Sequence, residues 1–301
     1  MPRVIQENNK KIYIKMKTTN RSKVINSFKG LNSKLQIKSL NKYLTFKNEP
    51  YYVDKITGLV FNKALLDDEK QINLYSAKVY KKKFTKNTYS SNIPAVKARH
   101  HYVYEIIKNN LKIQNKKILD VGAGDGSFLN LFQNKKKLLA IEPKKENHNL
   151  IKKKGIKSLN SSILNAKLNT KYDIATLIWT ACNFNNVYES IKKLSKHVNK
   201  NGYLVVAESS RIMVHPKKNI KEWVGEMHRY FNPTHFTKNS LVNLLKINGF
   251  EIKFINRYYD TDHLVIIAKN THKKFNKFEV DDYKKILKFF KLWEKIDKFL
   301  K

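Results

Sequence analysis

The chain has 301 residues, of which 41% are hydrophobic and 12% aromatic, and its formal net charge is +37. A chain of this length and hydrophobic content buries a substantial core, which excludes an intrinsically disordered polymer. No apolar run is long enough to span a bilayer, and the N-terminal stretch MPRVIQENNKKIYIKMK lacks the apolar segment of a secretory signal. We therefore expect a cytoplasmic protein that does not insert into membranes.

The single cysteine, Cys182, excludes an internal disulfide and a zinc site built from cysteines.

The positive charge is almost entirely lysine, because arginine occurs only at positions 3, 21, 99, 211, 229 and 257. Arginine is the better ligand for phosphate, and lysine spread along the whole chain is typical of an AT-rich genome. We therefore do not favour a nucleic-acid partner, and an anionic partner stays an open alternative.

Residues 1–48 form a basic, asparagine-rich extension in which only KIYIKMK alternates as a strand does. Residues 49–100 follow as a small module. Within it, YYVDKITGLVF predicts a β-hairpin with Gly58 near its turn, and ARHHYVYEIIKNNL, which begins at its end, predicts an amphipathic helix.

From residue 117 to about 270, short apolar strands alternate with segments of helical spacing. The strands are KILDV, LLAIE, IATLI, YLVVAE, FEIKFI and HLVIIA, and helical faces between them are marked by Leu129/Phe132 and Val187/Ile191/Leu194. This alternation predicts parallel pairing with right-handed crossovers in a domain over residues 101–270. The last two strands are joined only by NRYYDTD, so we expect them to pair antiparallel. The predicted fold is α/β, a doubly wound sheet with a reversed strand at one edge.

Residues 271–301 contain one more amphipathic helix. Its apolar stripe, which faces away from a row of lysines, consists of Tyr283, Ile286, Leu287, Phe290, Trp293 and Ile296. Such a stripe is ordinarily a core contact, so we expect the helix to dock on its own domain rather than to lie on a membrane surface.

The stretch ILDVGAGDGSF places three glycines directly after the first strand of the sheet, where ligands of open α/β sheets bind. Gly126 follows Gly122 and Gly124 one residue earlier than the dinucleotide fingerprint G-x-G-x-x-G requires. Asp120 before the turn disfavours a pyrophosphate and favours a cation, and Glu142 after the second strand suits the two ribose hydroxyls. The pattern predicts a positively charged nucleoside without phosphates, namely S-adenosylmethionine.

Between residues 100 and about 270 the chain resembles the class I S-adenosylmethionine-dependent methyltransferases. LDVGAGDGSF is similar to their first motif and AIEP to their second. The resemblance implies a Rossmann-like, seven-stranded sheet with an antiparallel edge strand, accompanied here by the small N-terminal module and the C-terminal helix. It implies S-adenosylmethionine as the cofactor, and a nicotinamide dehydrogenase is the alternative.

The cofactor-binding residues that the resemblance implies lie mostly at the ends of strands and are Asp120, Gly122, Ala123, Gly124, Gly126, Glu142, Pro143, Ser161, Trp179 and, from the small module, Tyr75. Asp120 would orient the methionine ammonium, Glu142 would hold the ribose, and Pro143 would line the adenine pocket. Ser162 is an alternative to Ser161 beside the adenine amine, and Tyr80 accompanies Tyr75 in covering the cofactor.

The stretch YYVDKITGLVFNKALLDDEKQINLYSAKVY resembles the N-terminal module of sugar methyltransferases, in which a C-x-x-C-G-L-x-F zinc knuckle precedes a tyrosine-rich helix. Asp54 and Thr57 stand here at the positions of the cysteines. Because zinc needs four good ligands, we predict no metal.

Methyl transfer to an alcohol or a carbon acid needs alignment and removal of a proton. Relatives often carry a Glu-His pair after the fourth strand, where this chain has Cys182 and Asn183; we expect Cys182 to be a small buried residue rather than a nucleophile. The candidates for a base lie in GEMHRYFNPTHFTKNSL. They are His228, with Glu226 as its orienting partner, and His235, which also suits a role in capping the following helix or packing against it.

The sequence therefore predicts a methyltransferase of a small molecule, a sugar or nucleotide-linked sugar of surface polysaccharide, with O-methylation favoured over C-methylation. Two alternatives stay open. One is an RNA methyltransferase that holds its substrate with the basic extension, and the other is a non-catalytic module that binds S-adenosylmethionine.

Overall fold

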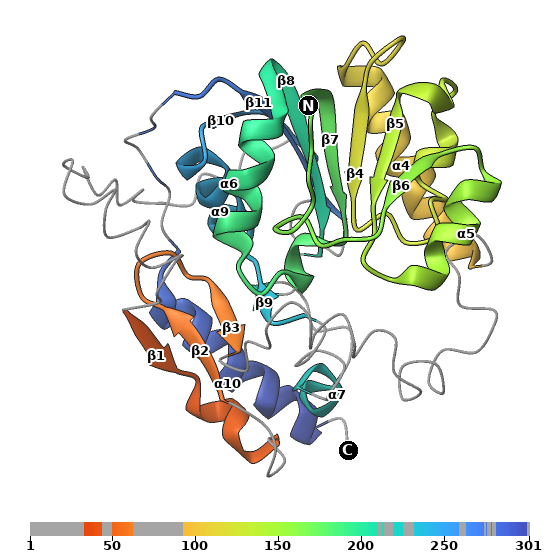
Figure 1. Cartoon of the computed structure of the whole chain (residues 1–301). Coiled ribbons are helices and arrows are strands. Elements are labelled where there is room, and N and C mark those ends of the chain that lie inside the picture. Colours follow the sequence, from red (N-terminus) through yellow and green to blue (C-terminus); the bar gives the residue numbers. More distant parts are fainter. Residues whose placement is uncertain are drawn as a thin grey trace, which may run out of the picture.

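The larger of the protein's two described sheets has seven strands, as a computed structural model shows (Figure 1). The structure describes residues 33–43, 50–62, 93–209, 212–213, 219–224, 232–258, 263–273, 275, 278 and 281–299. The strand order is β10-β11-β8-β7-β4-β5-β6. These strands are β4 (Ile118–Val121), β5 (Leu138–Ile141), β6 (Lys157–Leu159), β7 (Tyr172–Ile178), β8 (Val198–Glu208), β10 (Phe250–Ile255) and β11 (Leu264–Asn270).

The predicted doubly wound sheet is confirmed. Strands β4, β5, β6, β7 and β8 pair in parallel, whereas β11 is antiparallel to both β8 and β10. The reversed strand β11 therefore lies one position in from the edge, between β8 and β10. Every residue of β4 is buried, as expected for a central strand that helices cover on both faces.

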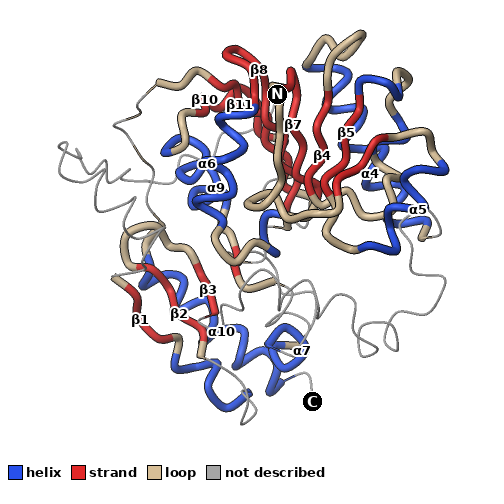
Figure 2. Tube along the Cα trace, viewed as in Figure 1, coloured by secondary structure: helices blue, strands red, loops and turns tan. Residues whose placement is uncertain are grey.

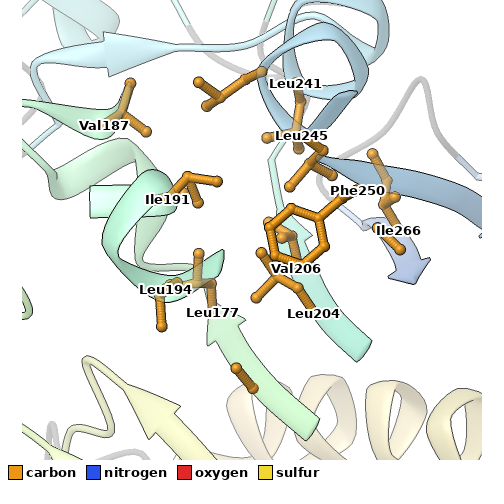
Figure 3. Close-up of a cluster of buried hydrophobic side chains, with 14 of the residues drawn as sticks. Leu177, Val187, Ile191, Leu194, Leu204, Val206, Leu241, Leu245, Phe250 and Ile266 are labelled. Atoms are coloured by element: carbon orange, nitrogen blue, oxygen red, sulfur yellow. The ribbon is translucent and has the colours of Figure 1, made fainter. Parts of the chain in front are cut away.

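Helices cover both faces of the sheet (Figure 1). On one face, α6 (Val187–His197) and α9 (Lys238–Ile247) pack over the strands. On the other, α4 (Pro94–Asn110) and α5 (Lys145–Lys153) contribute side chains to a second core. Figure 3 shows the first core, which includes Leu177, Val187, Ile191, Leu194, Leu204, Val206, Leu241, Leu245, Phe250 and Ile266.

The crossover between β4 and β5 differs from the prediction. The spacing of Leu129 and Phe132 predicts a helix, but the structure has only single 3-10 turns at η4 (Leu129–Leu131) and η5 (Lys135–Lys137). Leu129 and Phe132 are nevertheless buried in the core on the α4 face. Their apolar spacing thus reflects packing onto the sheet rather than a continuous helix.

A second, antiparallel sheet of four strands lies beside the carboxyl edge of the large one (Figure 2). Its order is β1-β2-β3-β9, with β1 (Lys34–Gln36), β2 (Tyr51–Asp54), β3 (Val60–Asn62) and β9 (Thr234–His235). The predicted hairpin is confirmed by the pairing of β2 with β3, and Gly58 in its turn has φ +72°. Strand β1 comes from residues that the sequence analysis assigns to the basic extension, and the division at residues 48, 100 and 270 stays a prediction.

The C-terminal helix α10 (Tyr283–Phe299) packs on the small sheet. Its stripe residues Ile286, Phe290 and Trp293 are buried together with Trp223 of the short helix α7 (Ile220–Val224) and with η1 (Lys38–Tyr43). Docking of this helix within the protein is therefore confirmed. Within the ranges that the structure describes, no helix has the length and hydropathy needed to cross a membrane.

Strand β9 connects the two sheets. It follows β8 in the chain, yet it pairs with β3, with Val60 opposite His235. It also lies beside the 3-10 turn η6 (Ala181–Asn183), which comes directly after β7. The small sheet is thereby held next to the carboxyl end of a central strand of the large sheet.

Candidate cofactor and acceptor site

The turn after β4 is built around three glycines in the left-handed backbone region. Gly122, Gly124 and Gly126 have φ values of +75°, +56° and +77°. A Cβ atom at Gly122 would lie 2.4 Å from Cγ2 of Thr180, and one at Gly126 would lie 3.1 Å from Cγ1 of Ile151. Glycine is therefore required at Gly122 and Gly126 both by the backbone conformation and by close packing against Thr180 and Ile151.

Asp120 lies at the end of β4, immediately before this turn, and is only 1% exposed. The hydroxyl of Thr176 on β7 donates a hydrogen bond of 2.6 Å to its carboxylate. Burial raises the pKa of Asp120 to about 7, with the nearby charge of Glu142 adding to the shift and the Thr176 hydrogen bond opposing it. The carboxylate is thus poised to ionise when a cation approaches.

Glu142 follows β5 and is bound to the glycine turn. Its Oε2 accepts a hydrogen bond of 2.9 Å from the backbone N–H of Gly124, and its Oε1 accepts one of 2.9 Å from that of Lys144. Burial raises the pKa of Glu142, whereas these two hydrogen bonds and the side chain of Asn147 lower it. A carboxylate accepts about four hydrogen bonds, so capacity remains for a hydroxyl group of a ligand.

The residues after β6 lie next to Glu142 and Pro143 at the same edge of the sheet. The hydroxyl of Ser161 donates to the backbone carbonyl of Ser162, and the hydroxyl of Ser162 accepts from the backbone N–H of Asn165. Asn160, which the sequence analysis missed, donates a hydrogen bond of 2.8 Å to the carbonyl of Pro143. The feature of the sequence that could have identified Asn160 is its position directly after β6.

These donors and acceptors fit S-adenosylmethionine. Two buried carboxylates suit an ammonium and a ribose, and glycine backbone in the turn allows a ligand to approach closely. The lysine that reaches the turn, Lys154, donates to the backbone carbonyl of Asp125 at 2.8 Å. Asp125 itself accepts from the N–H of Ser127 and fixes the turn from within.

Beyond the turn, the residues that follow β7 line the same edge of the sheet. Trp179 has φ +52°, and its backbone N–H donates a hydrogen bond of 2.7 Å to the backbone carbonyl of Ala207. Cys182 is half-buried, and its backbone N–H donates to Oε1 of Glu208 at 3.0 Å. The Cys182 side chain is thus only partly buried, rather than buried as expected, and it packs against the core that α6 and α9 cover.

Two titratable residues at this edge were missed by the sequence analysis. Glu208 ends β8 and is 1% exposed. His100 lies on α4, and its Nδ1 is 3.1 Å from the hydroxyl of Ser127. Burial lowers the pKa of His100, opposed by the charge of Asp125, so the ring is neutral near pH 7.

Of the two candidates for a base, the structure describes only His235. His228 and its predicted partner Glu226 lie outside the described residues, as do Tyr75 and Tyr80, which are predicted to cover the cofactor. His235 is 2% exposed on β9, where its ring centre lies 4.6 Å from that of Trp223.

The cap of the following helix is not His235. At the start of α9, the hydroxyl of Thr237 accepts from the N–H of Ser240, and the hydroxyl of Ser240 accepts from the N–H of Thr237. This reciprocal capping box leaves His235 in contact with the aromatic side chains of the small sheet.

Hydrogen bonds close the hairpin turn between β2 and β3 at Asp54 and Thr57, the two positions that the sequence analysis compares with cysteines. Oδ2 of Asp54 accepts from the N–H of Thr57 at 2.7 Å and from its hydroxyl at 2.5 Å. The hydroxyl of Ser33 donates to the other carboxylate oxygen. Hydrogen bonds to Asp54 thus hold this turn, and the absence of a metal stays a prediction.

A family model described as a methyltransferase domain matches residues 96–253, just over half of the chain. No curated protein matches the chain. Similar solved structures include a possible histamine N-methyltransferase from Thermotoga maritima, with 16% identity and a TM-score of 0.47 over 66% of this chain and 99% of that one. The N-methyltransferase NodS from Bradyrhizobium japonicum, in complex with S-adenosyl-L-homocysteine, has 13% identity and a TM-score of 0.48 over 67% of this chain and 97% of that one.

A third similar structure is 1,6-didemethyltoxoflavin-N1-methyltransferase from Burkholderia thailandensis, with 13% identity and a TM-score of 0.48 over 74% of this chain and 99% of that one. The family match covers the glycine turn, both carboxylates and the central strands described above. The chain belongs to the methyltransferase-domain family and is a class I S-adenosylmethionine-dependent methyltransferase.

Proposed function

We propose that the protein methylates a hydroxyl group of a small polar acceptor, a sugar or nucleotide-linked sugar used for surface polysaccharide, in the cytoplasm. The observation that supports this proposal is the position of the small sheet. Strand β9 joins it to the turn after β7, so the two sheets border the same carboxyl edge. Side chains at this edge, such as Trp179, His100 and Tyr102, mix aromatic rings with hydrogen-bonding groups, as sites for small polar molecules do.

In this proposal the residues of the glycine turn hold the cofactor. Asp120 attracts the ammonium group, Glu142 accepts hydrogen bonds from the ribose hydroxyls, and Gly122 lets the turn pack against Thr180. When bound, the cofactor supplies an electrophilic methyl group on a sulfonium that leaves as a neutral thioether. The acceptor oxygen forms the new bond to the methyl carbon as the bond from that carbon to sulfur breaks.

The proton of the acceptor hydroxyl has to go to a base. We assign this role to His228, with Glu226 as the group that orients its ring, and His235 is the second candidate. The packing of His235 against Trp223 supports a structural role for it over a catalytic one. Loss of the His228 imidazole would lower the turnover rate about 100- to 10,000-fold and leave cofactor affinity unchanged.

The acceptor class is tested by incubating the protein with methyl-labelled S-adenosylmethionine and a fractionated host extract. Label in a saccharide or nucleotide-sugar fraction supports the proposal, whereas label in RNA that is lost on deletion of residues 1–45 contradicts it. The Glu142→Ala variant is the negative control because it retains the acceptor side of the site. Absence of label in every fraction, with S-adenosylhomocysteine still bound, favours the non-catalytic alternative and also contradicts the proposal.

A further inference from the structure

Arg99 is held against an aromatic ring at the carboxyl edge of the large sheet. It lies near the start of α4, and its guanidinium carbon is 5.6 Å from the centre of the Trp179 ring. Arg99 is only partly exposed. A guanidinium stacked in this way keeps its planar fork of N–H donors in one orientation, which favours bidentate binding of an anion.

The ring that supports Arg99 is itself fixed from several directions. The left-handed backbone of Trp179 is held by its hydrogen bond to Ala207, and a bulky residue in that conformation stores strain. The ring of His263, which directly precedes β11, meets the Trp179 ring edge-on at 6.3 Å. Strain of this kind is tolerated where the surrounding structure imposes it, and it is concentrated at functional sites.

A hydrogen-bonded group secures His263 in turn. The ring of Tyr102 on α4 packs edge-on against that of His263 at 6.3 Å. The side-chain amide of Asn256 donates to the Tyr102 hydroxyl at 2.9 Å and to the carbonyl of His263 at 2.6 Å. Three segments therefore converge on Arg99 and Trp179: α4, the end of β7 and the β10–β11 connection.

Within the described ranges, no carboxylate forms an ion pair with Arg99. The buried acids at this edge of the sheet accept hydrogen bonds from other groups. Asp120 binds Thr176, Glu142 binds Gly124, and Glu208 binds the backbone at Cys182. A partly buried cation with five N–H donors gains most from an anionic ligand.

The composition of the chain supports a specific use of the guanidinium. Of its 61 basic residues, 55 are lysine, so arginine is the exception. Stacking on an aromatic face and forked hydrogen bonding are the properties that lysine does not supply. Arg99 lies over an aromatic ring and offers a forked set of donors, so it suits a ligand that is recognised by shape as well as by charge.

We propose that Arg99, stacked on Trp179, binds a carboxylate or phosphate group of a ligand at the carboxyl edge of the sheet. Two ligands can carry that anion: the methionine part of the cofactor, and an acidic acceptor such as the nucleotide-linked sugar of the proposed function, on which this second source rests. The chemistry is the same in both cases, and binding measurements separate them.

The test uses calorimetry on the full chain and on the variants Arg99→Ala, Arg99→Lys and Lys108→Ala. Lys108 lies near the far end of the same helix, so its loss removes the same charge away from Trp179. The first probe is S-adenosylhomocysteine, compared with its decarboxylated analogue, which lacks only the carboxylate. The second probe is inorganic pyrophosphate, titrated into protein that is saturated with S-adenosylhomocysteine.

If the anion belongs to the cofactor, Arg99→Ala weakens S-adenosylhomocysteine binding about 10- to 100-fold and leaves the decarboxylated analogue unaffected. If it belongs to the acceptor, the same variant leaves both nucleosides unaffected and weakens pyrophosphate binding by a similar factor. In either case Arg99→Lys has an intermediate effect and Lys108→Ala has none. The proposal is overturned if a folded Arg99→Ala variant, judged by an unchanged circular-dichroism spectrum, binds all three probes as the wild type does.

Failure of this inference differs from failure of the proposed function. Label that enters RNA would contradict the sugar acceptor and would leave the calorimetric results standing. Unchanged affinities in Arg99→Ala would refute the role of Arg99, whatever fraction the label enters.

Discussion

The carboxylate of Glu142 accepts a hydrogen bond of 2.9 Å from the backbone N–H of Gly124. This bond joins the acidic residue after β5 to the glycine turn after β4. The two motifs that the sequence predicts as separate parts of one cofactor site are thus physically connected. A change at either residue is expected to disturb both the ribose contact and the shape of the turn.

Replacement of Glu142 by alanine is expected to weaken binding of S-adenosylhomocysteine about 10- to 100-fold. The variant loses an acceptor for ribose hydroxyls and also leaves the N–H groups of Gly124 and Lys144 without their partner. Glu105→Ala, which removes an exposed carboxylate on α4, is the matched control. Equal affinities for the two variants in calorimetry would exclude Glu142 from the cofactor site.

A methyl group at Gly122 is expected to abolish measurable cofactor binding and to destabilise the fold by about 1–3 kcal/mol. The new Cβ would lie 2.4 Å from Thr180 in a backbone conformation with φ +75°. Gly155→Ala is the control for the conformation alone, because Gly155 has φ +72° and a Cβ there would meet no atom within 4 Å. The Gly155→Ala variant should lose about 1 kcal/mol of unfolding free energy and should bind the cofactor normally. Urea unfolding measures the stability and calorimetry measures the affinity.

Cofactor binding is expected to strengthen as the pH rises toward 7. The pKa of Asp120 is raised to about 7, so below that value the carboxyl is protonated and does not attract an ammonium group. Affinity for S-adenosylhomocysteine should increase by up to about tenfold per pH unit between about pH 5.5 and 7, and then level off. In Asp120→Asn the pH profile is flat, and a flat profile for the wild type would refute this role.

The same raised pKa also affects the stability of the cofactor-free protein. A carboxyl whose pKa is higher in the folded than in the unfolded state stabilises the fold fully below the unfolded value of 3.8. This stabilisation is lost as the pH rises through about 7. The difference in unfolding free energy between wild type and Asp120→Asn should therefore shift against the wild type over this range, and a constant difference would contradict it.

Local sequence patterns predict the central residues of the candidate cofactor site. Gly122 and Glu142 are recognisable because a tight turn and an acid at the next strand end leave distinct marks in the sequence. β6 was missed since Lys157–Leu159 contains a single apolar residue, and its strand character comes from parallel pairing with β5. The pairing of β9 with β3 was equally inaccessible, because two residues carry no periodic signal.

The residues around Trp179 show a different limit. Arg99 and His263 come from segments that are distant in sequence, and each contacts the ring of Trp179. Neither has a motif around it. The sequence predicts which strand ends form the edge of the sheet, but it does not predict which side chains meet across that edge.

The hairpin at Asp54 is expected to be stable without metal. A chelator such as EDTA should leave the thermal midpoint unchanged, because hydrogen bonds from Thr57 and Ser33 hold the turn. Asp54→Ala should cost about 2 kcal/mol or more, since it removes the acceptor of several buried donors. A drop in the midpoint on addition of EDTA would show that a metal contributes to stability.

Two neighbouring residues on α10 test its docking on the small sheet. Trp293 is 3% exposed and Leu292 is 55% exposed. Trp293→Ala should destabilise the protein by about 3–5 kcal/mol, whereas Leu292→Ala should stay within about 0.5 kcal/mol of the wild type. Similar losses for both variants in urea unfolding would contradict the packing of this helix.

The central claim is that the glycine turn and its two carboxylates bind a positively charged adenosine compound without phosphates. Calorimetry of the purified protein with S-adenosylmethionine, and in parallel with a nicotinamide dinucleotide, tests it most directly. The predicted result is one site for S-adenosylmethionine, with affinity weakened in Glu142→Ala, and no heat with the dinucleotide. Binding of the dinucleotide without binding of S-adenosylmethionine would contradict the account.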